Sequence, residues 1–277
     1  MTERNEITLS AQGRFLKLSV CGGGGGAKGK RSLVTEFSRA SRLRLLQKMA
    51  TIKSSGLKSV FLTLTYGQEF PSPREAKRHL DNFMKRIKRH HDCVSGFWRL
   101  EFQERGAPHF HLLLFGLPFV PKETLATLWG EIVGQRYWDN SVFPMRPPFT
   151  RIEALASHKH ASRYVAKYVA KSDAVGSGFN IASYLTAEGH FIHPVTLEDC
   201  GSIGRFWGVF NASCLPLADL VEIIVNGGGV EALKVLRRAL AATRWRVDEA
   251  SRFGFFLFED NPYTWCEYFE ELLGVRA

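Results

Sequence analysis

Two histidines separated by one phenylalanine, His109 and His111, form the first pattern in the sequence that could do chemistry. On a β-strand, residues two apart project from the same face. A turn at 104–107 would make a hairpin that places Glu101 opposite His109 or His111, with Cβ atoms about 4.5–5.5 Å apart. Two imidazoles and one carboxylate would then converge. Such a set leaves positions open for water and phosphate oxygens, as a catalytic divalent metal ion requires.

These ligand types leave the identity of the metal open, because imidazole accepts zinc whereas a carboxylate suits Mg²⁺ or Mn²⁺. A His-x-His pair alone is weak evidence, since it also occurs on solvated strand faces. The carboxylate at a matching register is what favours a metal site over that alternative.

A second pattern lies at 163–171, where the sequence reads RYVAKYVAK. On a helix with 100° per residue, Tyr164 and Tyr168 project on nearly the same side. Lys167 and Lys171 share that side, while the valines and alanines fill the opposite one. The apolar residues therefore define the packed face. Tyrosines that served only in core packing would be expected among the valines instead.

A phenol on a lysine-rich helix face is a candidate nucleophile. Its pKa is about 10 in water, so it is inert at neutral pH unless ammonium groups or a metal ion stabilise the phenolate. The lysines can also bind phosphate as point charges. Attack on a phosphodiester gives a phosphotyrosine ester, which conserves the bond energy and allows rejoining without ATP. The two patterns together predict metal-dependent cutting and rejoining of DNA.

Hydrophobic periodicity and turn residues predict the elements that must position these groups. We expect strands at 15–21, 59–66, 96–103, 109–116, 149–155 and 204–211. We expect helices at 33–54, 74–91, 121–134 and 159–172, with Ser72 as a cap of the second. This order, with a central hairpin, favours an α+β, ferredoxin-like fold in which helices flank an antiparallel sheet.

The charge of the chain favours a polyanionic partner. The formal net charge is +10, and residues 74–92 hold seven Lys or Arg against three acids. We therefore expect DNA contacts from Lys85, Arg86 and Arg89. A basic enzyme without a nucleic-acid partner is the alternative that charge alone leaves open.

Other features of the composition indicate a cytoplasmic protein of the host cell. No apolar run reaches about 18 residues, so we expect no membrane span, and the polar N-terminus lacks a signal-peptide core. The five cysteines are widely spaced and form no CxxC motif, which is typical of reduced thiols.

Three segments, in this order, resemble the motifs of HUH endonucleases: FLTLTY at 61–66, HFHLLLFG at 109–116 and YVAKYVAK at 164–171. Within that superfamily the chain is most similar to rolling-circle replication initiators of small single-stranded-DNA phages and related bacterial plasmids. The resemblance covers about residues 36–211. The ordered set of three motifs is specific, whereas any one of them alone is not.

The resemblance implies a role for each matching residue. His109, His111 and Glu101 would ligate Mg²⁺ or Mn²⁺, and the two tyrosines would nick DNA and transfer the strand. The two lysines of the tyrosine motif would assist at the phosphate. Further DNA contacts are expected from Thr63, Thr65 and Arg163.

The implied function is initiation of rolling-circle replication. One tyrosine would nick a single-stranded or hairpin origin, leaving a covalent 5′-phosphotyrosine and a free 3′-hydroxyl, and the displaced strand would later be rejoined. We expect a host helicase and a host polymerase as partners, and no membrane. The expected divisions are a basic, Gly-rich segment at 1–35, an HUH endonuclease domain at 36–211 and a small, mainly helical C-terminal region at 212–277.

Two alternatives remain open at this point. A two-tyrosine HUH transposase would use the same chemistry on transposon ends. A DNA- or RNA-binding module without catalytic activity would need only sheet aromatics and basic residues. The second alternative leaves Glu101, His109 and His111 on one face unexplained.

Overall fold

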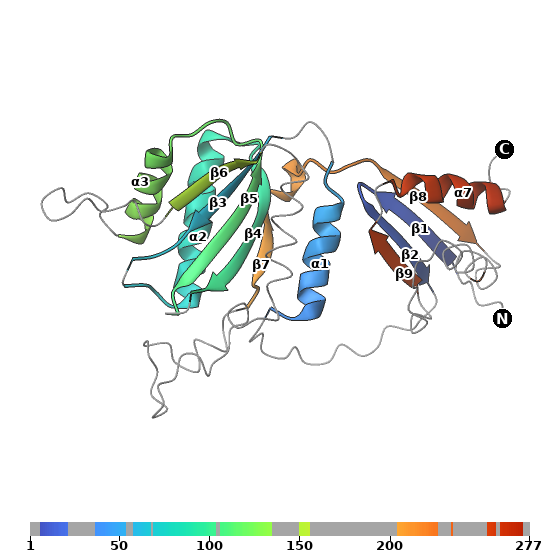
Figure 1. Ribbon diagram of the computed structural model, residues 1–277, viewed down its shortest axis with the longest axis horizontal. Helices are drawn as coiled ribbons and strands as arrows, with labels where there is room; N and C mark the ends of the chain where they lie inside the picture. The colour runs from blue at the N-terminus through green and yellow to red at the C-terminus, as the bar shows by residue number, and fades with distance from the viewer. Residues whose placement is uncertain are drawn as a thin grey trace, which may run out of the picture. The chain divides into compact units, whose positions relative to one another are not determined.

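The computed structural model describes residues 6–21, 37–53, 58–67, 69–103, 106–134, 150–155, 204–226, 234, 254–258 and 261–273. The chain divides into two compact units. The central unit comprises Arg31–Leu46 and Ser55–Pro216, and the terminal unit comprises Met1–Lys30, Gln47–Ser54 and Leu217–Ala277. Each unit contains its own antiparallel sheet (Figure 1).

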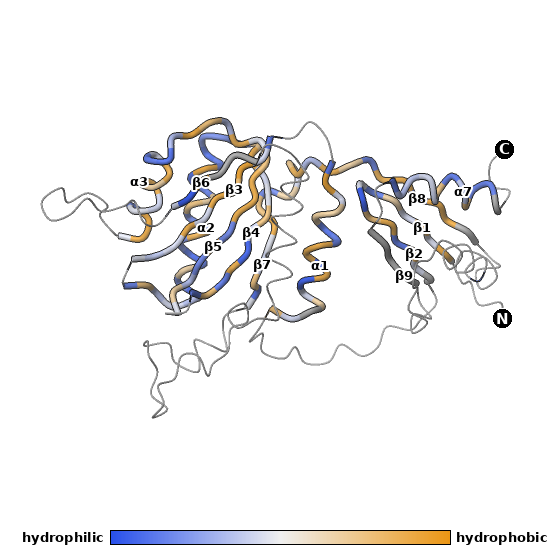
Figure 2. Tube along the Cα trace, viewed as in Figure 1, coloured by the Kyte–Doolittle hydropathy of each residue, from blue (hydrophilic) through white to orange (hydrophobic). Residues whose placement is uncertain are grey.

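The sheet of the central unit has five strands in the order β6-β3-β5-β4-β7. Every neighbouring pair is antiparallel. Hydrophobic residues run through these strands (Figure 2), as burial of the sheet between other layers requires. The strands are β3 (Ser59–Leu64), β4 (Ser95–Phe102), β5 (Pro108–Phe115), β6 (Thr150–Leu155) and β7 (Trp207–Phe210).

Alternation along β4 and β5 gives this sheet two different faces. Leu100, Phe110 and Leu112 are completely buried on one face, which we call the apolar face. The residues between them in sequence, including Arg99 and His111, point to the opposite face. We call that side the polar face.

Helix α2 (Pro73–His90) covers the apolar face. Its buried residues recur at intervals of three and four, which places them in one stripe along the helix. Lys77 of α2 lies 6.0 Å from the ring of Trp98, a residue of the apolar face. The helix begins as the sequence predicts, because the Ser72 side chain accepts a hydrogen bond from the Glu75 N–H and Pro73 occupies the first turn.

Helix α3 (Lys122–Val133) packs beside α2 through Trp129. The Trp129 ring is fully buried and makes edge-on contacts with Tyr66 and Phe83. Its indole N–H donates a 2.6 Å hydrogen bond to the Thr65 carbonyl at the end of β3. This contact joins α3 to the strand that lies beside the histidine strand.

Helix α1 (Arg39–Ala50) begins in the central unit and ends in the terminal unit. Within the central unit, the Trp207 indole N–H donates to the Ser41 hydroxyl at 3.1 Å, which ties α1 to β7. Phe37, just before α1, stacks on Phe206 with ring centroids 6.4 Å apart. A short 3-10 helix, η3 (Ala212–Cys214), follows β7.

The terminal unit has a four-stranded sheet in the order β8-β1-β2-β9. Helix α7 (Tyr263–Leu273) buries Cys266 and Phe269 in the core that also holds Ile7, Leu9 and Leu16. The strands are β1 (Glu6–Gln12), β2 (Phe15–Cys21), β8 (Leu220–Asn226) and β9 (Gly254–Phe258).

The β1–β2 turn requires a glycine at position 13. Gly13 has a φ of +62°, and a Cβ there would lie 2.4 Å from the Ala50 carbonyl oxygen. The next residue, Arg14, donates its N–H to the same oxygen at 2.8 Å. The turn therefore packs closely against the end of α1 within the terminal unit.

The structure confirms the predicted α+β class with antiparallel sheets flanked by helices. The expected central strands and helices agree with it to within a few residues, except for α1, which is shorter than the predicted helix at 33–54. The terminal unit differs from the expected division at 35 and 212. Strands β1 and β2 pair with β8 and β9, so segments from both ends of the sequence form one sheet. The predicted helix at 159–172 lies outside the described residues.

Among the residues that the structure describes, no helix combines the length and apolar character that crossing a membrane requires.

Candidate active site

The β4–β5 hairpin sets the register of the site. Glu101 pairs directly with His109, and Arg99 pairs with His111. The expectation that Glu101 lies opposite one of the two histidines is confirmed. Gly106, with a φ of +84°, lies in the connection, where Gln103 and Ala107 are joined by a 2.9 Å backbone hydrogen bond.

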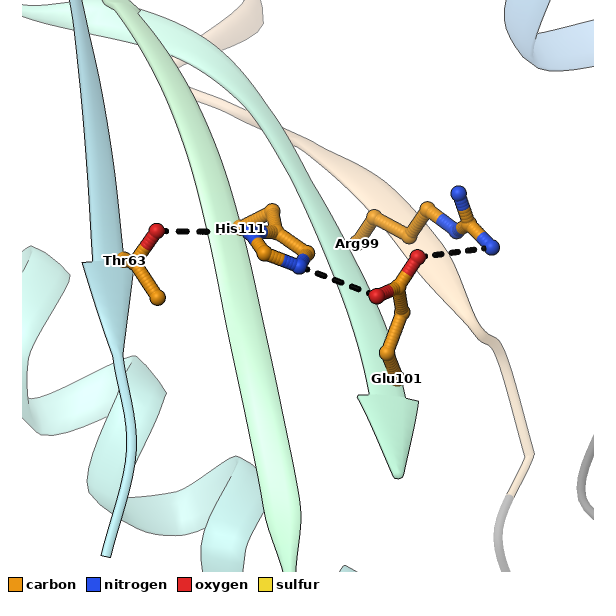
Figure 3. Close-up of polar contacts among 4 residues, drawn as sticks. All are labelled: Thr63, Arg99, Glu101 and His111. Carbon is orange, nitrogen blue, oxygen red and sulfur yellow. Dashed lines mark hydrogen bonds and ion pairs between the residues drawn. The ribbon is translucent and has the colours of Figure 1, made fainter. Parts of the chain in front are cut away.

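Four side chains of the polar face contact one another in a line across β3, β5 and β4 (Figure 3). The Thr63 hydroxyl oxygen lies 3.4 Å from Nδ1 of His111. Nε2 of His111 lies 3.0 Å from Oε2 of Glu101, and Oε1 of Glu101 lies 2.9 Å from Nη2 of Arg99. We call Thr63, His111, Glu101 and Arg99 the polar network.

The polar network is largely shielded from water. The side chains of Arg99, His111 and Glu101 are 5%, 7% and 14% exposed. Burial by itself raises the pKa of Glu101. The hydrogen bond from His111 and the nearby charges of Arg99 and the histidines outweigh it, so the pKa of Glu101 lies below its ordinary value. Glu101 is therefore an ionised carboxylate at neutral pH.

An ionised carboxylate only accepts hydrogen bonds, so Nε2 of His111 carries the hydrogen that it shares with Glu101. Other aromatic rings hold the imidazole from the sides. The ring of Phe61 stacks on it with centroids 5.5 Å apart, and the ring of His109 approaches it edge-on at 4.5 Å. The Arg99 guanidinium lies 4.8 Å from the centre of the Phe37 ring, a distance at which a cation and an aromatic face attract.

Cross-strand partners extend this line over the whole width of the sheet. Thr63 pairs with Arg151 on β6, and Arg99 pairs with Trp207 on β7. Arg151 is exposed, whereas Arg99 is buried. The polar face therefore combines a shielded ionic centre with a solvent-facing cation on β6.

The donor set of Glu101, His109 and His111 suits a divalent cation in its chemistry, since one carboxylate and two imidazoles share one face. In the structure the carboxylate is engaged by His111 and Arg99. Within the described ranges, no three His, Cys, Asp or Glu side chains are grouped as ligands of a metal ion. Binding of a cation would require the contact between His111 and Glu101 to open, so that Nε2 and Oε2 both faced the cation.

The remaining predicted residues fall into three groups. The first lies outside the described residues and comprises Arg163, Tyr164, Lys167, Tyr168 and Lys171. The second is on α2, which covers the apolar face and thus lies across the sheet from the polar network. There Lys85 pairs with Asp81 at 2.7 Å, Arg86 pairs with Glu131 at 2.8 Å, and Arg89 is exposed.

The third group consists of the two threonines at β3. Thr63 joins the polar network, whereas Thr65 is buried after the strand ends. The Thr65 hydroxyl has no hydrogen-bond partner among the described residues. Their places in the structure therefore differ although their residue type is the same.

Sequence reasoning missed Arg99 and Arg151. Alternation along β4 places Arg99 on the same face as Glu101, which was the available signal for it. The register of β3 against β6 brings Arg151 beside Thr63, and no local pattern reports a pairing between strands so far apart in sequence.

An antiparallel α+β domain with an ionic His–Glu–Arg centre on one sheet face is the class of protein that this geometry defines. Residues 59–173 match the model of the replication-associated protein ORF2 family. This part of the chain therefore carries a replication-associated domain of that family, and the resemblance to Rep-type rolling-circle replication initiators is confirmed. No curated protein and no solved structure matches the chain.

The matched segment contains β3, β4, β5 and β6, and with them all four residues of the polar network. It also includes the tyrosine motif at 163–171. A family match over these residues supports a role in the initiation of DNA replication.

Proposed function

We propose that this protein initiates rolling-circle replication by nicking one DNA strand at an origin with Tyr164 or Tyr168. One observation carries the proposal. The segment that matches a replication-associated family gathers Glu101, His109 and His111 on one face of its sheet. A protein that only bound DNA would have no need of this donor set.

In the proposed step, the phenolate oxygen of one tyrosine attacks the scissile phosphorus. A bond forms between Tyr Oη and phosphorus, and the bond between phosphorus and the 3′ oxygen breaks. The products are a 5′-phosphotyrosine and a strand whose 3′ oxygen takes up a proton. Mg²⁺ or Mn²⁺ bound at Glu101, His109 and His111 would supply polarisation of the phosphoryl oxygen.

The other groups of the chain support this step by charge. Lys167 and Lys171 would favour the phenolate and hold the phosphate. Arg151 lies on the polar face and is exposed, so it is well placed to contact the DNA backbone, and Arg163 would add a second cation. After one round of synthesis the second tyrosine would cut the regenerated junction, and the displaced strand would be closed into a circle.

The test is formation of a covalent adduct. The full chain is incubated with end-labelled single-stranded DNA from its own replicon and Mn²⁺, and adducts are detected on denaturing gels and mapped by mass spectrometry. The proposal expects a DNA adduct on Tyr164 or Tyr168, and none in the double variant Tyr164→Phe, Tyr168→Phe. Tyr268→Phe is the matched control, because Tyr268 is an exposed tyrosine of the terminal unit.

Each outcome bears on the proposal. An adduct that persists in the double variant, or that maps to another residue, would exclude the tyrosine mechanism. Adducts only at the ends of a mobile element, and none at a replicon origin, would favour the two-tyrosine transposase. DNA binding that needs no metal and gives no adduct would favour a binding module without catalytic activity.

A further inference from the structure

The position of Thr63 does not match the DNA contact expected from the sequence. Its hydroxyl is turned along the sheet toward Nδ1 of His111, 3.4 Å away, and its strand β3 pairs with β5 at this residue. Because Nδ1 is the nitrogen remote from Glu101, Thr63 and Glu101 contact the two ends of one imidazole (Figure 3).

The chemistry of a hydroxyl suits both states of this ring. With Nε2 protonated toward Glu101, a neutral His111 presents an acceptor at Nδ1, and the Thr63 hydroxyl donates to it. If Nε2 instead offered its lone pair to a cation, the hydrogen would lie on Nδ1 and the hydroxyl would accept it. A side chain that both donates and accepts holds the ring in one orientation throughout, which valine in the same volume would not do.

The other contacts of His111 do not perform this task. Phe61 stacks on the ring and His109 meets it edge-on, so both limit tilting of the ring. Neither ring contact depends strongly on which nitrogen faces Glu101. Arg99 holds the far oxygen of the carboxylate and fixes Glu101 rather than His111.

We propose that Thr63 is a positioning residue for His111, directing Nε2 toward Glu101 and toward the cation that the proposed function places there. The orientation of the ring is a property of the protein alone. Its consequence for cation affinity rests on the proposed function. These two parts are measured separately.

The first experiment uses the full chain without added metal. Long-range ¹H–¹⁵N spectra of the imidazoles, assigned with His111→Gln, report which ring nitrogen carries hydrogen. We expect the wild type to show hydrogen on Nε2 of His111. Thr63→Val should shift both nitrogen resonances toward the values of a ring that exchanges between tautomers, and Thr63→Ser should restore them.

The matched control is Thr65→Val, which removes the same hydroxyl two residues away at a site without a hydrogen-bond partner among the described residues. We expect its His111 resonances to equal those of the wild type. Unchanged resonances in Thr63→Val would overturn the proposal. So would equal shifts in Thr63→Val and Thr65→Val, because the effect would then be general to the strand.

The second experiment measures Mn²⁺ binding from the electron paramagnetic resonance signal of the free ion. Loss of an outer hydrogen bond to a ligating histidine typically weakens metal binding about 10–100-fold, and we expect a loss in this range for Thr63→Val. Thr63→Ser should bind nearly as the wild type does. If Thr63→Ser binds as weakly as Thr63→Val, the hydroxyl is not the cause and the proposal fails.

The proposed function and the positioning role fail in different ways. A wild type that binds no Mn²⁺ and forms no adduct would refute the metal-dependent nicking, while the imidazole spectra would still decide whether Thr63 orients His111. Normal His111 spectra in Thr63→Val, together with weaker binding to single-stranded DNA, would return Thr63 to the role of a DNA contact.

Discussion

Replacing Arg99 by methionine tests whether the polar network stabilises the sheet or only occupies it. Methionine retains much of the apolar stem but removes the guanidinium that pairs with Glu101 and lies over Phe37. Glu101 would remain ionised in a site where its side chain is 14% exposed. The variant therefore leaves a shielded carboxylate with one partner fewer.

The magnitude follows from the burial of the pair. Removing one partner of a buried ion pair typically costs about 3–5 kcal/mol, and the attraction between a cation and an aromatic ring adds about 0.5–2 kcal/mol. Glu101 keeps its contact with His111 and some access to water, which lowers the expected cost. We expect a loss of about 3 kcal/mol in the local free energy of opening.

Hydrogen exchange of the β4 and β5 amides is the appropriate assay, because a chain with two units need not unfold in a single step. Each 1.4 kcal/mol corresponds to a factor of ten, so a loss of about 3 kcal/mol speeds exchange through opening about 100-fold. Lys85→Met is the matched control. It breaks the exposed Lys85–Asp81 pair, whose side chains are 63% and 56% exposed, and exposed pairs contribute less than about 1 kcal/mol.

The double variant Arg99→Met, Glu101→Gln distinguishes the cause. If the cost arises from an uncompensated carboxylate, neutralising Glu101 recovers part of the lost protection. Exchange in Arg99→Met that stays within about threefold of the wild type would refute the reasoning, since that is under 1 kcal/mol. So would a double variant that is less stable than either single variant by the sum of their effects.

Three further predictions concern other parts of the chain. Gly13→Ala should destabilise the terminal unit by about 1–3 kcal/mol through backbone strain, and by more than Gly134→Ala destabilises α3, as measured by local hydrogen exchange. Both glycines have positive φ, but a Cβ meets a backbone oxygen only at Gly13, so equal effects would contradict this. Lys77 has its pKa lowered to about 8 by burial and by Arg205. The unfolded chain then binds more protons between about pH 8 and 10.5, and the stability of the wild type relative to Lys77→Met should rise across that window in urea titrations; a flat difference would contradict it. Arg151→Ala should weaken binding of a single-stranded oligonucleotide and reduce the salt slope by about 0.7 in fluorescence anisotropy. Lys85→Ala should change the slope less, and the reverse order would place the DNA on α2.

The hairpin could be predicted because its signals are local. The period of two along β4 and β5 separates His109, His111 and Glu101 from the leucines and phenylalanines of the core. The turn between the strands is short, so one register follows from the sequence. Arg99 shares the face of Glu101 by the same alternation. Its ion pair depends on side-chain geometry and its ring contact on Phe37, which no spacing reports.

The terminal sheet could not be predicted in the same way. The segment LVEIIVN at 220–226 contains a strand signal, but its partner β1 lies at the other end of the sequence. Gln12 and Ala218, which are 206 positions apart, share a hydrogen bond across this sheet. Pairings over such distances depend on how the intervening unit folds, and local propensity carries no record of them.

The pairing of β1 and β2 with β8 and β9 has a consequence for biosynthesis. The central unit is in effect an insertion between the two halves of the terminal sheet. On the ribosome the β1–β2 hairpin emerges first, and a lone hairpin is at best marginally stable in water. Both its edges stay open until residues 220–258 have been made, so the part of the protein that is translated first completes its fold last.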